Sequence, residues 1–382
     1  MQPVGIYSSA ALLWPALVAA EAGRLTSDLA QDLASLAAGA AQGSEVGSRR
    51  WATRNLVTLE LPTMRLRDFS TCGEGVPALV CAPFALHRAT IGDFAHQHSL
   101  IETLLAEGIH HLLLTDWRSA TAEMRFFSID TYLADLNVAV DHVGGKVDMI
   151  GICQGGWMAL IFAARFPQKV RKLVIAGAPV DLAVESAISI AAKTVSLSVF
   201  KDLVALGQGR ILGQRMLPLW GWCDLDSAAI REILQLPGEL QSRSAKAREA
   251  RFRAWNATTV NLPGTYYLEV VQWIFRENRL AEGRLLALGQ RVDLAAVRQP
   301  IFVVASRDDE FVALGQVLNT TRLVGTADRH RREAIVTGSH LSLFMGRKTL
   351  SDTWPRIAAW LRAQSPSGRS RHRAEALPVQ AA

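Results

Sequence analysis

The sequence predicts an α/β fold in which helices cover both faces of a mostly parallel sheet. Short apolar runs alternate with helical patterns along most of the chain, and one apolar run turns directly into a helix through Gly151-Ile152-Cys153-Gln154-Gly155. Size also supports the prediction, because 382 residues that are 49% apolar and 20% charged can bury a large core in one elaborated domain.

The predicted strands begin after residue 49 and are short apolar segments bounded by turn residues. In chain order they cover residues 56–61, 76–81, 111–115, 147–151, 172–176, 300–305 and 333–337. Between residues 182 and 293 this alternation stops, and longer helical patterns over 183–205 and 263–279 replace it. We therefore expect an α/β core formed by residues 49–181 and 294–364, with a helical cap inserted at 182–293.

The two ends of the chain differ from this pattern. Residues 1–48 are rich in Ala, Leu and Ser, and we expect a helical extension suited to docking or self-association. Its apolar stretch at 10–20 is too short for a membrane span, which needs about 20 apolar residues. A signal peptide is the alternative, although no Lys or Arg precedes the apolar part. Residues 365–382 are polar and aperiodic, and we expect disorder there.

The turn at residues 151–155 has the arrangement of a nucleophile elbow. In α/β hydrolases the nucleophile stands between two glycines on a sharp turn from strand to helix, and here Cys153 takes that position between Gly151 and Gly155. The sequence thus predicts the α/β-hydrolase fold with Cys153 as nucleophile. The alternative is an inert cysteine buried in a tight turn, since free cysteine often acts as a small hydrophobe.

A carboxylate and a histidine follow the elbow in the chain order that this fold uses. The predicted strand 300–305 ends shortly before Asp308 and Asp309, at the edge where active sites of α/β sheets lie. We prefer Asp309, with Asp308 second. The last predicted strand leads to His340, the candidate base. Among the other histidines only His87 lies near the expected edge. The rest have no matching carboxylate, and we expect most of them at the surface: His96, His98, His110, His111, His142, His330 and His372.

The chemistry of such a site also needs two backbone N–H donors for an oxyanion. One is expected from Gln154, the residue after the nucleophile, and the other from Phe84 or Ala85 in the loop after strand 76–81. A cysteine thiolate is a strong nucleophile and a good leaving group, so it suits acyl transfer from a thioester as well as hydrolysis.

The hexapeptide at residues 151–156 resembles the lipase-box-like motif of polyhydroxyalkanoate (PHA) synthases. Other landmarks of that family follow in order over roughly residues 50–364: Thr115-Asp116-Trp117, Ile129-Asp130-Thr131-Tyr132, Ala178-Pro179-Val180-Asp181, Trp255-Asn256, Asn261-Leu262-Pro263-Gly264, Glu277-Asn278-Arg279-Leu280 and Val292-Asp293-Leu294. Carried over residue by residue, the family's nucleophile, carboxylate and histidine fall on Cys153, Asp309 and His340.

The resemblance implies an acyltransferase that moves hydroxyacyl groups from CoA thioesters to a growing polyester, without a cofactor. Its partners would be hydroxyacyl-CoA, the polyester, the surface of a PHA granule and a second copy in a homodimer. Much of the aromatic content of the predicted cap would either line an acyl channel or pack within the cap: Trp220, Trp222, Trp255, Tyr266, Tyr267, Trp273 and Phe275.

Three departures from the family pattern keep other functions open. Trp157 replaces a small residue, and residues 257–259 lack the Asp expected after Trp255-Asn256. Residues 82–88 lack the Asn expected near the loop after strand 76–81 and, like residues 344–348, look somewhat like intracellular PHA depolymerases, although the chain as a whole is nearer to the synthases. The alternatives are therefore a cysteine-dependent hydrolase, either a depolymerase or a thioesterase, and a non-catalytic granule-associated protein.

Cysteine spacing and net charge give no support to a disulfide-stabilised, metal-binding or nucleic-acid-binding protein. Cys72, Cys81, Cys153 and Cys223 form no C-x-x-C pair and no metal-ligand spacing, so we expect neither disulfides nor a metal site, and a cytoplasmic location. The net charge of +6, from 41 basic and 35 acidic residues, could attract CoA phosphates or an anionic granule, but solvated helix faces explain it as well. No motif supports nucleic-acid binding.

Overall fold

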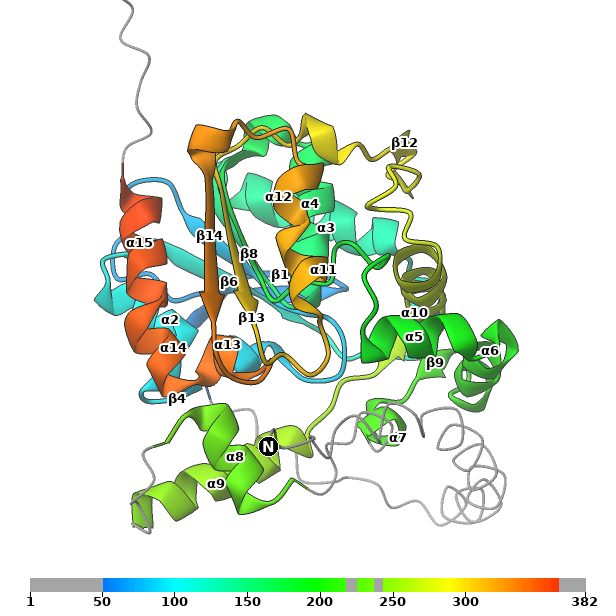
Figure 1. Ribbon diagram of the computed structural model, residues 1–382, viewed down its shortest axis with the longest axis horizontal. Helices are drawn as coiled ribbons and strands as arrows, with labels where there is room; N and C mark the ends of the chain where they lie inside the picture. Colours follow the sequence, from blue (N-terminus) through cyan, green and yellow to red (C-terminus); the bar gives the residue numbers. More distant parts are fainter. Residues whose placement is uncertain (1–50, 218–224, 237–242, 364–382) are drawn as a thin grey trace, which may run out of the picture.

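The computed structural model describes residues 51–217, 225–236 and 243–363 (Figure 1). The predicted N-terminal extension at 1–48 and the predicted disordered tail at 365–382 lie outside these residues, as do Trp220, Trp222 and Cys223. Within the described ranges, none of the helices combines the length and the apolar character that a bilayer crossing requires.

The centre of the molecule is an eight-stranded sheet. In spatial order its strands are β1 (Leu56–Glu60), β2 (Met64–Asp68), β6 (Leu112–Trp117), β3 (Ala78–Cys81), β7 (Val147–Ile152), β8 (Val170–Ala176), β13 (Ile301–Ser306) and β14 (Arg331–Val336). The six strands from β6 to β14 are parallel, whereas β2 pairs antiparallel with both β1 and β6. The predicted mostly parallel sheet is therefore confirmed.

The prediction missed one strand of this sheet. Residues 64–68 read Met-Arg-Leu-Arg-Asp, a stretch too short and too charged to stand out as a strand in the sequence. In the fold Met64 and Leu66 are fully buried while the arginines between them face the other side, so β2 follows the strand period of two. It forms an antiparallel hairpin with β1. The sequence predicted only the first strand of this hairpin, at residues 56–61.

Helices cover both faces of the sheet (Figure 1). One face carries α2 (Leu100–Ala106), α14 (Arg347–Asp352) and α15 (Trp354–Arg362), and the other carries α3 (Ile129–His142), α4 (Gln154–Arg165), α11 (Leu314–Leu318) and α12 (Thr320–Leu323). Because both faces are covered, the central strands β6, β7 and β13 are buried along their whole length, as their apolar sequences require.

The chain between β8 and β13 is mostly helical. Its described helices include α5 (Ala187–Thr194), α6 (Leu197–Leu206), α7 (Gly213–Met216), α8 (Ser227–Leu234), α9 (Arg243–Asn256), α10 (Gly264–Glu269) and the π-helix η5 (Val270–Arg276). Two short antiparallel strand pairs accompany them: β9 (Arg210–Ile211) with β10 (Leu262–Pro263), and β11 (Leu286–Ala287) with β12 (Gln290–Arg291). The division into core and cap stays a prediction.

Both long helices expected in this segment are wrong in detail. The pattern at 183–205 is broken after Thr194, because Ser196 caps a new helix by accepting a hydrogen bond from the Ser198 N–H at 3.3 Å. The pattern at 263–279 begins as an α-helix at Gly264 but changes its winding at Val270.

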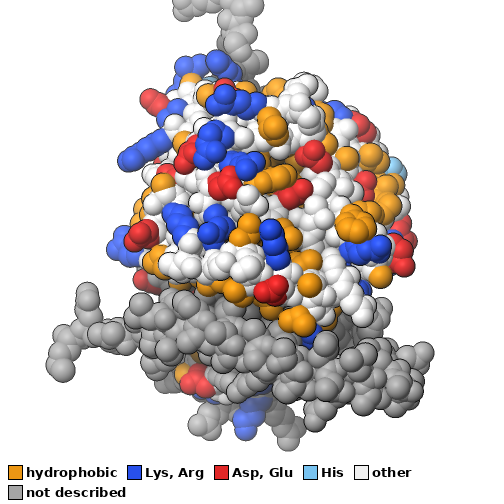
Figure 2. All heavy atoms as spheres, turned by 90° about the vertical axis from the view of Figure 1, so that its right-hand side faces the viewer, with side chains coloured by type: hydrophobic (Ala, Val, Ile, Leu, Met, Phe, Trp, Pro, Cys, Tyr) orange, Lys and Arg blue, Asp and Glu red, His pale blue; other side chains and the backbone are white. Residues whose placement is uncertain are grey.

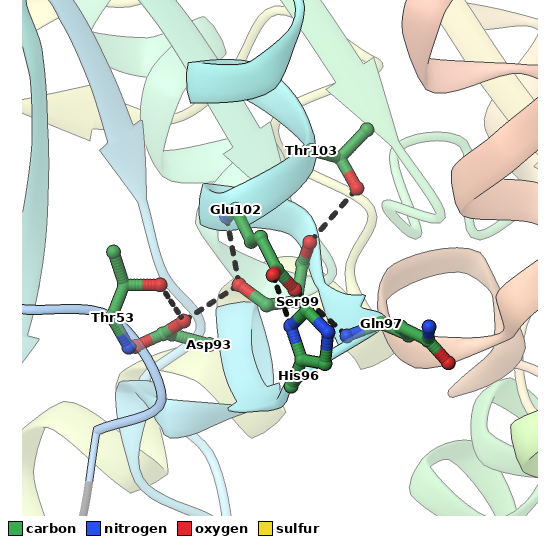
Figure 3. Close-up of polar contacts among 7 residues, drawn as sticks. All are labelled: Thr53, Asp93, His96, Gln97, Ser99, Glu102 and Thr103. Carbon is green, nitrogen blue, oxygen red and sulfur yellow. Dashed lines mark hydrogen bonds and ion pairs between the residues drawn. The ribbon is translucent and has the colours of Figure 1, made fainter.

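A buried polar cluster fastens the start of the described chain to the core (Figure 3). The Asp93 carboxylate in β4 (Asp93–Ala95) is fully buried and accepts hydrogen bonds from the Thr53 N–H at 2.9 Å, the Thr53 hydroxyl at 2.8 Å and the Ser99 hydroxyl at 2.6 Å. Ser99 in β5 (His98–Ser99) also caps α2 by accepting from the Glu102 N–H. These bonds join three separate segments at one carboxylate.

His98 lies beside this cluster and contradicts the expected surface position. Its side chain is fully buried, and its Nδ1 is hydrogen-bonded at 2.8 Å to the Met345 carbonyl in α13 (Ser342–Met345). His96, two residues earlier, is exposed as expected. The polar neighbours of His98 in the sequence concealed its burial, because the β4–β5 turn points the two rings in different directions.

On the face of the molecule in Figure 2, basic side chains are interspersed with acidic and apolar ones. This mixing is typical of solvated surfaces and fits the small net charge.

Candidate active site

The predicted nucleophile lies at a strained turn between β7 and α4. Cys153 has φ 51° and ψ −129°, a conformation that residues other than glycine rarely adopt. Its N–H donates to the Ala176 carbonyl at 2.8 Å, and its own carbonyl accepts from the Gly156 N–H at 2.9 Å. Such a turn presents the side chain at the end of the sheet, as a nucleophile elbow requires.

The glycines around Cys153 are needed for close packing. A Cβ atom on Gly151 would lie 2.5 Å from the Gly156 Cα, and one on Gly155 would lie 2.8 Å from the Ala82 carbonyl oxygen. Gly156 has the same property, since its Cβ would clash with the Ala178 side chain. None of the three has a positive φ, so the glycines allow α4 to approach the sheet and leave the unusual backbone angle to Cys153 itself. Gly156 was not among the predicted elbow glycines.

The structure brings Cys153, Asp309 and His340 together. His340 Nδ1 lies 2.6 Å from Asp309 Oδ2, and the side chains are 5% and 1% exposed. The other carboxylate oxygen of Asp309 accepts from the N–H groups of Phe311 at 2.9 Å and Val312 at 2.8 Å, which fixes the carboxylate plane. His340 and Cys153 line the same cavity.

The electrostatics of this group favour a charged imidazole. Burial by itself would lower the pKa of His340, but the Asp309 carboxylate and the Cys153 side chain together raise it well above its usual value. An imidazolium beside a cysteine stabilises the thiolate form, which is the reactive one.

Three consecutive acidic residues hold the loop that carries His340 at three different points. Asp308 accepts from the Gly338 N–H at 2.9 Å, Asp309 binds the His340 ring, and Glu310 accepts from the His340 N–H at 2.9 Å. Burial raises the pKa of Glu310, and the hydrogen bond from His340 opposes that effect. Asp308, the second candidate for the triad carboxylate, thus binds the backbone N–H of Gly338, whereas Asp309 binds the imidazole ring of His340. Sequence reasoning missed the contact of Glu310.

His87, the alternative base, occupies another part of the site. Its ring is buried, stacks on Trp255 with centroids 4.3 Å apart, and bonds through Nε2 to the Asn256 carbonyl at 3.1 Å. Burial lowers the pKa of His87 to about 4, so the ring is neutral at physiological pH.

A cavity of about 60 Å³ opens beside Cys153. The residues around it are almost all apolar: Pro83, Ala85, Leu86, His87, Ile91, Cys153, Gln154, Pro179, Ile188, Phe275, Phe311, Val312, His340 and Leu341. Gln154 and Ala85, two of the predicted oxyanion donors, border it. Phe84 instead turns its ring into an aromatic cluster, with centroids 4.7 Å from Tyr132 and 5.3 Å from Tyr266.

Trp157, the departure from the PHA synthase pattern on α4, is fully buried. In the described part of the chain, no group of three or more His, Cys, Asp or Glu residues is arranged to hold a metal ion.

Comparisons with known proteins agree with the resemblance. Residues 233–365 match the family model described as the C-terminus of PHB depolymerases. Over 326 residues the chain is 22% identical to the poly(3-hydroxyalkanoate) polymerase subunit PhaC of Haloferax mediterranei, a match that covers 83% of this chain but only 65% of the relative. The PhaC subunit of Synechocystis is 25% identical over 300 residues, which cover 75% of this chain and 78% of the relative.

Among solved structures, the monoacylglycerol lipase of Paleococcus ferrophilus superposes with a TM-score of 0.50 at 14% identity, covering 78% of this chain and 98% of the lipase. At that identity the likeness concerns the fold alone. The predicted α/β-hydrolase fold and the resemblance to PHA polymerases are confirmed.

Proposed function

We propose that this chain is an acyltransferase of the PHA polymerase type, which transfers hydroxyacyl groups from CoA thioesters to a growing polyester. The observation that carries the proposal is that Cys153, at a nucleophile elbow, lines the same cavity as a His340 ring paired to Asp309, in a chain similar to PHA polymerases.

In the first step His340 accepts the proton of Cys153, and the thiolate attacks the thioester carbonyl of hydroxyacyl-CoA. The N–H groups of Gln154 and of Ala85 or Phe84 stabilise the oxyanion that forms. When the tetrahedral intermediate collapses, the bond to CoA sulfur breaks and CoA leaves as a thiol with the proton from His340. The acyl group is then a thioester on Cys153.

In the second step a hydroxyl group attacks this thioester, and His340 accepts its proton while Asp309 orients the ring. The hydroxyl oxygen forms the new ester bond, and the sulfur of Cys153 leaves. The apolar cavity beside Cys153 supports transfer, since a site that excludes water protects the acyl-enzyme from hydrolysis. The product would place the protein in the cytoplasm at the surface of a polyester granule.

A cysteine hydrolase is the second candidate. The match of residues 233–365 to the C-terminus of PHB depolymerases favours it, because the match includes the segment that carries Asp309 and His340. Water would then replace the hydroxyl in the second step, with the same three residues in the same roles.

The deciding experiment incubates the purified chain with 3-hydroxybutyryl-CoA, measures free CoA with a thiol reagent and identifies the product. We expect CoA release with polyester, and no release from the Cys153→Ala variant. Release with free 3-hydroxybutyrate would assign the chain to the hydrolases. If CoA is not released by the wild-type chain and no acyl group is found on Cys153, neither enzymatic function holds.

A further inference from the structure

The outer wall of the cavity beside Cys153 comes from the segment between β8 and β13. Ile188 in α5 and Phe275 in η5 line the same space as Cys153 and His340. Both side chains are apolar and have no group that could take part in the chemistry, so they can act on the reaction only by shaping the cavity.

Phe275 occupies its position because of an unusual helix. The seven residues Val270–Arg276 form a π-helix, whereas most π-helices are single turns inserted in α-helices and are frequent at functional sites. In this wider winding, residues four and five apart lie on one face. Val270, Ile274 and Phe275 are accordingly all buried, and Phe275 is 6% exposed.

The two helices of the wall are fastened to each other. Arg276, the last residue of η5, donates through Nη1 to the Val195 carbonyl at 2.6 Å and to the Ala192 carbonyl. Both carbonyls lie at the C-terminal end of α5, where the helix dipole favours a cation. Ile188 and Phe275 are therefore held by one connected unit.

Acyl groups of different length meet this wall to different extents. A 3-hydroxyoctanoyl group extends further from its thioester carbonyl than a 3-hydroxybutyryl group does. Because Ile188 and Phe275 line the same space as Cys153, the longer group is the one that their side chains obstruct.

We propose that Phe275, together with Ile188, limits the length of the acyl group on Cys153, so that 3-hydroxybutyryl is preferred to 3-hydroxyoctanoyl. This inference rests on the proposed function for the identity of the acyl group. The cavity wall sets the length limit whether the acyl group is later transferred or hydrolysed.

The test compares CoA release from 3-hydroxybutyryl-CoA and 3-hydroxyoctanoyl-CoA by the wild-type chain and by the Phe275→Ala variant. A cavity distinguishes neighbouring chain lengths by roughly 10-fold or more, so we expect the wild type to prefer the shorter substrate by at least that factor. Phe275→Ala should raise the relative rate on the longer substrate by about tenfold. Phe200→Ala is the matched control, because Phe200 is a buried ring of α6 that packs on Tyr267.

A second measurement tests the effect of Ile188 and Phe275 on chain length without a CoA substrate. Cys153 is alkylated with N-butyl- and N-octyl-iodoacetamide, and the two rates are compared by mass spectrometry. The octyl reagent should react more slowly with the wild type and with Phe200→Ala, and Phe275→Ala should abolish most of the difference. Equal rates in the wild type, or a length preference that Phe275→Ala leaves unchanged, would overturn the inference. If length selection appears only with the alkylating reagents and CoA is never released, the role of Phe275 in limiting chain length is supported and the proposed function is wrong.

Discussion

The two halves of the site are built by different means. Cys153, Asp309 and His340 follow the ends of three parallel strands, and backbone hydrogen bonds fix their loops. Ile188 and Phe275 instead belong to helices of the segment between β8 and β13, which side-chain packing and the Arg276 hydrogen bonds hold in place. In the proposed function, the loops at the sheet edge supply the chemistry and this segment bounds the substrate.

The register of the sheet explains why the first half is so well ordered. Ser306 at the end of β13 is paired with Val336 at the end of β14. Asp309 and His340 lie three and four residues beyond these partners, so their side chains can meet once the strands pair. Changes in this half should lower the rate on every substrate, whereas changes in the wall should alter which substrate is used. The following predictions test that separation.

Cys153→Ala should reduce turnover to background for short and long substrates alike, because the covalent step is lost. Iodoacetamide labelling with peptide mapping checks the assignment in the wild type. Cys81 should stay unlabelled, since burial raises the pKa of its thiol to about 12. Preferential labelling of the exposed Cys72 at neutral pH, with Cys153 silent, would refute the nucleophile.

His340→Gln should lower CoA release by about a thousandfold or more, because the thiol loses its proton acceptor. The pKa of His340 is raised by its partners, so the imidazolium of the wild type persists as pH rises. A cysteine beside an imidazolium is the more reactive nucleophile, so iodoacetamide should alkylate Cys153 faster in the wild type than in the variant at neutral pH. Equal alkylation rates would show that His340 does not activate the cysteine.

Asp309→Asn should remove most of the rate, since the amide cannot hold the imidazole in the productive tautomer. Asp308→Asn is the matched control in the adjacent position and should cost little, because Asp308 bonds the Gly338 N–H and lies away from the ring. Steady-state rates on 3-hydroxybutyryl-CoA measure both. Equal losses would mean that the three acidic residues act only by holding the loop.

The smallest effect is expected for a change in the contact between α10 and α3, and it concerns stability. Glu269 of α10 accepts from the Ile129 N–H at 2.7 Å, and burial raises the pKa of its carboxyl to about 7. Because the folded-state pKa lies above the unfolded value, this group contributes least to stability once it is ionised, so stability should fall as pH rises between about 4.5 and 7. Melting temperatures across that range should show a weaker pH dependence for Glu269→Gln than for wild type. Glu282→Gln, at an exposed glutamate, is the control and should leave the dependence unchanged.

The sequence predicted the first half of the site better than the second for a physical reason. Cys153, Asp309 and His340 each follow a short apolar strand, so chain order alone places them at one edge of a parallel sheet. The role of Glu310 was not visible, because a backbone contact to His340 depends on how the loops close. Phe275 could not be singled out among the aromatic residues, since neither its π-helix nor the break before Ser196 follows from periodicity.

The same limit applies to the rest of the fold. Strand β2 was missed because two arginines interrupt its apolar residues, and His98 was placed at the surface because its buried partner, Met345, is far away in the chain. Both errors concern residues whose environment is decided by distant segments. The glycines of the elbow were recognised by position, but the structure was needed to show why they are glycines: Gly151 packs against Gly156, and Gly155 packs against Cys81 and Ala82.

The three acidic residues after β13 also link activity to the order of folding. Each of them bonds to the loop that follows β14, the edge strand that pairs with β13 alone within the sheet. Parallel strands need a crossover connection, so β14 docks on β13 as residues 307–330 close into that crossover. Recovery of activity during refolding would therefore time the docking of β14, which makes the enzyme a reporter of the completion of its own sheet.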